Sequence, residues 1–146
     1  MTALRSIPRP ALAVGTAVFI FAALFFAYVL DVTHNGSGDV GGWLFVSVVA
    51  SLIAAALILR YVPNAESDSD LDNKPARRAL LLSILALVTF PAFWLGLPFV
   101  LGVPALVLAA EGQARAVDQG RGAEAVAAGA VSLLAIVSAL AACVAA

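Results

Sequence analysis

Four long windows without any Asp, Glu, Lys or Arg constrain this chain more than any other feature. They cover residues 11–30, 40–59, 79–110 and 125–146. A helix of a water-soluble globule needs a polar face, and these windows lack the charged side chains that would make one. Disorder is excluded as well, because disordered chains are poor in apolar residues, whereas 63% of this chain is hydrophobic. The sequence therefore predicts an all-α polytopic membrane protein, a small helical bundle of four hydrophobic segments that forms one domain over residues 1–146.

The first hydrophobic segment, about residues 11–30, has the length of one transmembrane helix. At 1.5 Å per residue it spans about 30 Å, which is the thickness of the hydrocarbon core. Arg5 and Arg9 precede it, as in a secretory signal, but the apolar run exceeds the roughly 7–15 residues of a cleaved signal. We therefore expect a retained helix.

The second segment, about residues 42–60, is flanked by side chains typical of membrane boundaries. Trp43 lies near its start, and Arg60 precedes Tyr61 at its end, the pattern of aromatic belts and snorkelling cations. Small side chains recur at every fourth position within it, so that helix backbones can approach closely and serines can hydrogen-bond across the contact. The residues predicted to form this packing stripe are Ser47, Ser51 and Ala55.

The third segment, residues 79–110, is too long for a single straight crossing. One helix of this length would measure about 48 Å, which ordinary tilt does not accommodate. Prolines and glycines also interrupt it, and proline breaks or kinks a helix because it lacks a donor and clashes one turn back. We expect a break near Trp94–Pro98, caused by Gly96 and Pro98, within a broken segment of about residues 76–119. The expected pieces are helices near 76–94 and 98–119, which gives four to five transmembrane helices.

The fourth segment, about residues 123–146, is rich in alanine and poor in large side chains. Such a helix covers little lipid but packs closely against other helices. We expect it to lie inside the bundle, against the third segment. Ala125 and Gly129 form a small-xxx-small pair, and Ala128 with Ser132 continues it. The predicted packing residues are Ala125, Gly129 and Ser132.

The distribution of Lys and Arg predicts the orientation. They occur before the first segment and at 74, 77 and 78 in the second loop, but not in the first loop, 31–42. By the positive-inside rule, the N-terminus and the second loop are cytoplasmic. Arg115 and Arg121 follow the third segment: they are cytoplasmic if it folds as a hairpin and outside if it crosses once. Both topologies remain open, although the length, the prolines and the charge favour the hairpin.

The first loop contains two patterns that resemble binding motifs. Gly36, Gly38 and Gly41 match GxGxxG, but the dinucleotide motif needs a preceding strand and a following soluble helix, so we interpret it as a turn. His34, the only histidine, lies between Asp31 and Asp39. Three ligands on a glycine-rich loop are poorly organised for a metal, and a solvated loop histidine is the preferred interpretation.

The second loop imitates part of a calcium loop. Asp68, Asp70 and Asp72 occupy positions 1, 3 and 5, but the glycine and glutamate required at positions 6 and 12 are replaced by Asn73 and Ala79. We therefore expect no metal or cofactor, and a helix start around Asp72 or Asn73, close to Pro75.

Cys143, the only cysteine, lies in an apolar helix and is interpreted as a core residue.

The last third of the chain resembles a known family. The run from Pro104 through Ala-Leu-Val-Leu at 105–108 is followed by Gly-Arg-Gly at 120–122 and by Ala128-Gly129. This resembles a bacterial membrane domain of unknown function, frequent in actinobacteria, whose members share a Pro/Gly-interrupted apolar stretch, a linker ending in GRG and a small-residue helix. Glu124, which follows the motif closely, and a spacing to Gly129 that is two residues longer depart from the pattern. The resemblance implies no activity.

These observations predict an integral membrane protein of structural or accessory type, and not an enzyme. The expected partners are the lipid bilayer and either further copies of the chain or a larger membrane-protein complex. A net charge of −1 gives no global attraction to nucleic acid. The alternative function is a small transporter or channel that uses the broken third segment. The expected location is the plasma membrane of a prokaryote, with several crossings and a cytoplasmic N-terminus.

Overall fold

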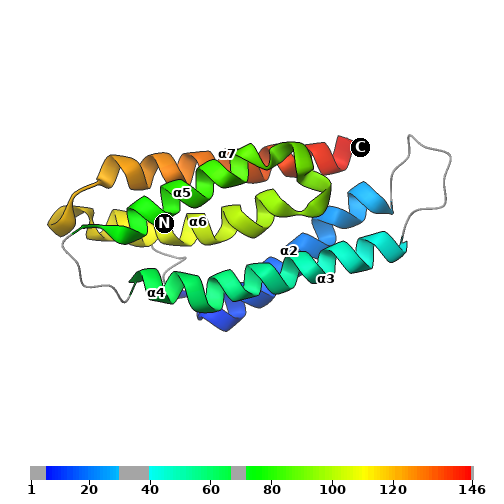
Figure 1. The fold of residues 1–146 in the computed structure, drawn as a ribbon, viewed down its shortest axis with the longest axis horizontal. Helices are drawn as coiled ribbons and strands as arrows, with labels where there is room; N and C mark the ends of the chain where they lie inside the picture. Colours follow the sequence, from blue (N-terminus) through cyan, green and yellow to red (C-terminus); the bar gives the residue numbers. More distant parts are fainter. Residues whose placement is uncertain (1–5, 30–39, 67–71, 146) are drawn as a thin grey trace.

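The computed structural model describes residues 6–29, 40–66 and 72–145, and within these ranges the chain is helical without any strand (Figure 1). The elements, in chain order, are α2 (Arg9–Tyr28), α3 (Val40–Ala56), the π-helix η1 (Leu57–Tyr61), α4 (Val62–Glu66), α5 (Lys74–Val88), the 3₁₀-helix η2 (Phe90–Leu95), α6 (Leu97–Gln119) and α7 (Gly122–Ala145).

Within the described ranges, four helical stretches are long and apolar enough to cross a membrane. They are Arg9–Tyr28, Val40–Glu66, Leu97–Gln119 and Gly122–Ala145. Helix α5, with 15 residues, is shorter, about 22 Å at 1.5 Å per residue, and lies beside α6 in the same bundle (Figure 1). The chain is thus an all-α polytopic membrane protein, and its described residues form four helices long enough to cross and a fifth, shorter helix alongside them.

The helices form two groups. Helices α2 and α3 pack against each other as one pair, while α5, α6 and α7 make the most extensive contacts with one another (Figure 1). In its most apolar window, α6 has 61% of its residues buried and α7 has 33%. The fourth segment therefore packs against the third, as expected, but the expectation that it lies inside the bundle is wrong. Helix α6 takes that place because α5 and α7 both cover it.

The third segment breaks near the predicted position and returns. Helix α5 ends at Val88, η2 follows, and Gly96 adopts a left-handed conformation with φ of 72° before α6 starts at Leu97 with Pro98 in its first turn. The first half is shorter than the predicted 76–94. Pro91, in the first turn of η2, cannot donate to an α-helical carbonyl one turn back, so α5 cannot continue through it.

The broken turn is held by one hydrogen bond from another helix and one within the turn. The Tyr28 hydroxyl of α2 donates to the Trp94 carbonyl at 3.0 Å, and the Gly96 N–H donates to the Phe93 carbonyl at 2.9 Å. The Thr89 hydroxyl does not donate to these carbonyls but to those of Leu85 and Ala86 within α5, at 2.9 and 3.1 Å. The turn lies at the end of the bundle where α2 ends and α3 begins (Figure 1).

The third segment is therefore a hairpin. Because α6 runs back along α5, the end of α6 lies beside the start of α5 (Figure 1). Arg115 and Arg121 consequently lie at the same end of the bundle as Lys74 and Arg78, and not at the opposite end.

The prediction that the second segment ends near residue 60 is wrong. The helix continues to Glu66. Pro63 lacks an N–H group and would crowd the Leu59 carbonyl in a regular α-helix. The wider turn of η1, in which the Val62 N–H donates to the Leu57 carbonyl five residues back, accommodates this proline. Only residues 67–73 remain between α4 and α5, so the second loop is shorter than the predicted segment ends at 60 and 76 imply.

A close backbone contact joins α5 and α6 at the end of the bundle where α5 starts. A Cβ atom added to Gly112 would lie 2.7 Å from the backbone N and Cα of Ala76. Both residues are buried, and no flexible side chain stands between the two backbones. Glycine at 112 is thus what permits α5 and α6 to approach this closely.

We predict that Gly112→Ala lowers the free energy of unfolding by about 1–3 kcal/mol, the usual cost of overpacking a tight contact. Thermal unfolding in detergent measures the change. Gly15→Ala is the matched control, because nothing lies within 4 Å of a Cβ at Gly15 in α2; alanine there should be neutral or add up to about 1 kcal/mol of helix propensity. Equal losses for both variants would contradict the tight contact.

Candidate functional site

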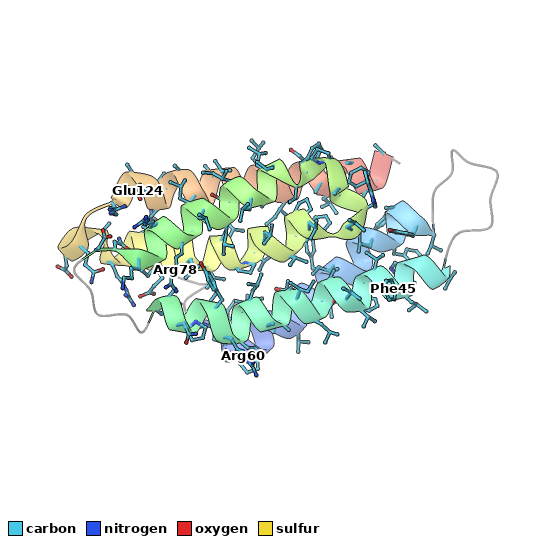
Figure 2. All side chains as sticks on the ribbon, viewed as in Figure 1. Phe45, Arg60, Arg78 and Glu124 are labelled. Carbon is cyan, nitrogen blue, oxygen red and sulfur yellow. The ribbon has the colours of Figure 1, made fainter. Side chains whose placement is uncertain are left out.

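Charged side chains gather at one end of the bundle, which we call the polar end. It comprises the start of α2, η1 with α4, the start of α5 and the turn between α6 and α7 (Figure 2). Arg60, Arg78 and Glu124, labelled in Figure 2, mark three of these elements, while Phe45 marks the apolar end of α3. The charge-free windows lie between the two ends of the bundle, as membrane-spanning segments require.

A buried amide organises the polar end. Asn73 is fully buried and caps α5, accepting a hydrogen bond from the Ala76 N–H at 3.3 Å. Its side-chain nitrogen donates to the Gly112 carbonyl at 2.7 Å and to the Gly120 carbonyl at 2.9 Å. One side chain thus starts α5 and binds the end of α6 to it. The sequence predicted a helix start here, but it contained no signal for the two distant carbonyls.

Arg121 joins the α6–α7 turn to the segment before α5. Its side chain forms ion pairs with Asp72, at 2.7 Å, and with Glu124 in the first turn of α7, at 3.2 Å. The hydrogen bond to Glu124 and the negative charge of Asp72 raise the pKa of Arg121 above its ordinary value. Its own backbone is left-handed, with φ of 59°, directly after Gly120 at the end of α6.

Two further arginines extend this network towards α2. Arg115 pairs with Glu111 one turn earlier in α6, at 2.9 Å, and also donates to the Glu66 carbonyl at the end of α4. The Glu66 carboxylate pairs with Arg9 at the start of α2. Residues from α2, α4 and α6 are therefore linked at the same level of the bundle, and these charges act as structural contacts.

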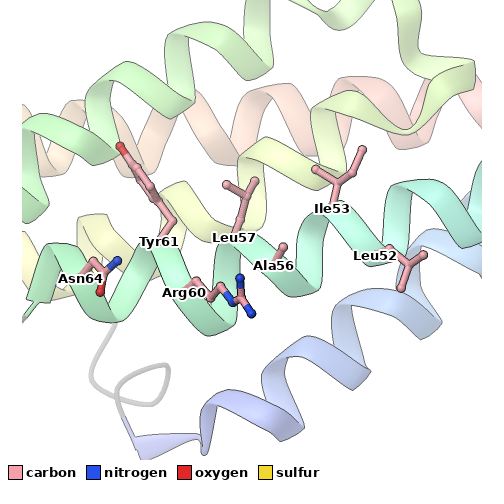
Figure 3. A pocket seen from close by; sticks show the side chains of 7 residues that line it. All are labelled: Leu52, Ile53, Ala56, Leu57, Arg60, Tyr61 and Asn64. Atoms are coloured by element: carbon pink, nitrogen blue, oxygen red, sulfur yellow. The ribbon is translucent and has the colours of Figure 1, made fainter.

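A shallow groove runs along α3 and η1 towards the polar end. It has a volume of about 490 Å³ and is shown in Figure 3. We call it the α3 groove; its lining residues are Leu52, Ile53, Ala56, Leu57, Arg60, Tyr61 and Asn64. In Figure 3, Ile53, Leu57 and Tyr61 extend on one side of the helix, and Arg60 and Leu52 extend on the other. The small side chain of Ala56 leaves the hollow between them.

Arg60 forms the charged part of this groove. Its side chain is exposed, and within the described residues no carboxylate pairs with it. Arg78 of α5, by contrast, lies with its guanidinium carbon 5.3 Å from the centre of the Tyr61 ring, a cation–π contact. The groove therefore has an apolar part and a polar head with Arg60 in it.

A second surface is the outward side of α7. Six exposed residues, separated alternately by four and three positions, form a stripe of mainly small side chains that we call the outer α7 face: Ala123, Ala127, Ala130, Leu134, Val137 and Ala141. Sequence reasoning missed it, because only the other side of this helix was considered. The signal was a 3.5-residue spacing of small residues next to Val126 and Leu133, which are also exposed.

The structure places the predicted packing residues on inward or half-inward positions. Ala125, Gly129 and Ser132 are buried on α7, Ser47 and Ser51 are buried on α3, and Ala55 is half-buried. Within the described residues, no hydrogen-bond partner lies beside the hydroxyls of Ser47, Ser51 and Ser132, so the expected hydrogen bonds across the contact are not present. Ser51 and Ala55 border an apolar groove of about 400 Å³ between α2 and α3.

The residues of the two metal-like sequence patterns do not form a metal site among the described residues. Among residues 6–29, 40–66 and 72–145, no three His, Cys, Asp or Glu side chains come together as a metal would need. His34, Asp31 and Asp39, as well as Asp68 and Asp70, lie outside the described residues. Asp72, the remaining member of the calcium-like run, pairs with Arg121. Cys143 is buried in α7.

Comparison with known proteins gives no relative. A scan against protein-family models, a search of curated proteins and a search of solved structures each found no match. The fold and the distribution of charge are therefore the basis for any statement about function. They establish a multi-pass membrane protein.

We predict that Asn73→Asp lowers the free energy of unfolding by about 1–3 kcal/mol. The carboxylate still caps α5, but it cannot donate to the carbonyls of Gly112 and Gly120, so the two hydrogen bonds that join the end of α6 to α5 are lost. Asn73→Ala should lose at least as much, because it also removes the cap. Urea or thermal unfolding in detergent measures both changes. A variant Asn73→Asp as stable as the parent would show that the amide donors contribute nothing.

Proposed function

We propose that this chain is a structural membrane protein that associates with further copies of itself through the outer α7 face. The observation that carries the proposal is the exposed stripe of small side chains on α7. Small residues on a membrane helix let another helix approach closely, and they make poor contact with lipid. The proposal includes no catalytic step.

The spacing of the outer α7 face favours a pair of parallel helices. A repeat of four and three residues follows the 3.5-residue period that keeps one seam facing a partner in a left-handed helix pair. In a two-fold dimer the same face serves both copies, so the two α7 helices run parallel and each alanine packs near its counterpart. Leu134 and Val137, more than half exposed in one copy, would then be covered.

The proposed location rests on the distribution of charge in the bundle. We propose the plasma membrane of a prokaryote, with the N-terminus and the polar end in the cytoplasm, because Lys74, Arg77, Arg78, Arg115 and Arg121 all lie at that end. The resemblance of residues 98–137 to the actinobacterial membrane domain supports the prokaryotic origin. It rests on the Gly-Arg-Gly sequence at 120–122 and on the small residues that follow.

The alternative function is a small transporter or channel, in which the broken third segment would line the path. Transporters built on discontinuous helices bind their substrates where the helices break, near the bilayer midplane. Here the break at Phe90–Gly96 lies at one end of the bundle (Figure 1), with Tyr28 bonded to it. No observation on this turn favours transport, and we therefore propose the structural role.

Cysteine crosslinking in native membranes tests self-association. In a Cys143→Ser background, Ala127→Cys, Ala130→Cys and Leu134→Cys should each form disulfide-linked dimers on oxidation, because all three positions lie on the outer α7 face. Ile84→Cys, on the exposed side of α5, is the control and should remain monomeric. Adding Ala130→Trp to Ala127→Cys should abolish the dimer, because the indole ring separates the two helices.

Three outcomes would overturn self-association. Monomers at every α7 position would remove the interface, and equal crosslinking of Ile84→Cys would show random collision. A crosslink to a different membrane protein in place of the dimer would assign the outer α7 face to a larger complex.

A further inference from the structure

We propose that the α3 groove binds an anionic phospholipid, with the phosphate at Arg60 and one acyl chain over Ala56. This site lies on α3 and η1, apart from the outer α7 face, and does not depend on self-association. The groove matches both parts of such a lipid. Apolar side chains line it along a transmembrane helix, and Arg60 lies where that helix reaches the polar end. Among the described residues, no carboxylate pairs with Arg60.

The position of Arg60 along the helix fits a headgroup. Arg60 lies 20 residues after Val40, which corresponds to about 30 Å of helix, the thickness of the hydrocarbon core. A guanidinium at this level can reach the phosphates of one leaflet. Because no carboxylate of the described residues pairs with it, its charge is available to a phosphate.

The shape of the groove fits an acyl chain. Ala56 forms its floor, with Leu52 on one side and Leu57 on the other, so the hollow runs along the helix towards the membrane interior (Figure 3). The π-turn of η1 contributes to this shape, because its extra residue rotates Arg60 and Tyr61 relative to a regular helix. The head and the tail of one lipid can therefore occupy the two parts of a single groove.

The surrounding charge favours an anionic lipid over a zwitterionic one. Arg78 contacts the Tyr61 ring from α5, and Lys74, Arg77 and Arg78 border a second hollow beside it. Asp72 also borders that hollow, but Arg121 pairs with it. Arg77 and Arg78, on the Tyr61 side of the groove, thus add to the positive potential of the polar end, as in the basic pockets between transmembrane helices that bind anionic headgroups.

Native mass spectrometry of protein released from vesicles tests the site. The vesicles contain equal amounts of phosphatidylglycerol and phosphatidylcholine, and the measurement is the number of each lipid retained per protein. We expect retention of one phosphatidylglycerol in preference to phosphatidylcholine. Arg60→Gln should lower this retention about fivefold, the effect of about one cation near a membrane surface, while Arg60→Lys should keep most of it.

Two more variants separate this groove from general surface charge. Ala56→Phe keeps every charge but fills the groove, and it should lower phosphatidylglycerol retention as Arg60→Gln does. Arg121→Gln removes a cation of the same end that Asp72 and Glu124 already pair, and retention should not change. The proposal is overturned if Arg121→Gln has the same effect as Arg60→Gln, if Ala56→Phe has none, or if the parent retains both lipids equally.

Discussion

Backbone hydrogen bonding in hydrocarbon decides where this chain can turn. A carbonyl or N–H without a partner costs several kcal/mol inside a membrane, so a break in a transmembrane helix needs either water or a donor from a neighbouring helix. The chain places its break at the end of the bundle, and the Tyr28 hydroxyl donates to the Trp94 carbonyl there. At the opposite end, the amide of Asn73 binds the carbonyls of Gly112 and Gly120. Side-chain hydrogen bonds to backbone carbonyls therefore hold the hairpin between α5 and α6 at both of its ends.

The return of the third segment determines where the charge lies. With α6 antiparallel to α5, Arg121 comes back to the carboxylate of Asp72, which precedes α5. Arg121 also pairs with Glu124, and Arg115 pairs with Glu111, so these charges stabilise the turn between α6 and α7 and the end of α6. Arg60, on the separate pair of helices, has no such partner among the described residues, and this difference is the basis of the lipid site.

Much of the fold could be predicted because its cause is local in sequence. Charge-free windows predict crossings, and Gly96 with Pro98 predicts a break. The extension of the second helix to Glu66 was not predicted, because a π-turn absorbs Pro63, and proline by itself usually signals an end. The central place of α6 could not be predicted either: it depends on two neighbours covering one helix. For the candidate site, Arg60 and Tyr61 were recognised as boundary residues, whereas the groove beside them and the outer α7 face required the arrangement of side chains in space.

The measurement that tests the hairpin most directly is thiol accessibility on its two sides. Asp72 precedes α5, and Val117, which is 92% exposed, lies near the end of α6. In a Cys143→Ser background, single cysteines at these two positions should behave alike: unlabelled by an impermeant reagent in intact cells and labelled after permeabilisation, whereas a cysteine at Ser37 should be labelled in intact cells. Labelling of both in intact cells would keep the hairpin and reverse the proposed orientation. Labelling of one without the other would show that the third segment crosses the membrane once, and would contradict the account.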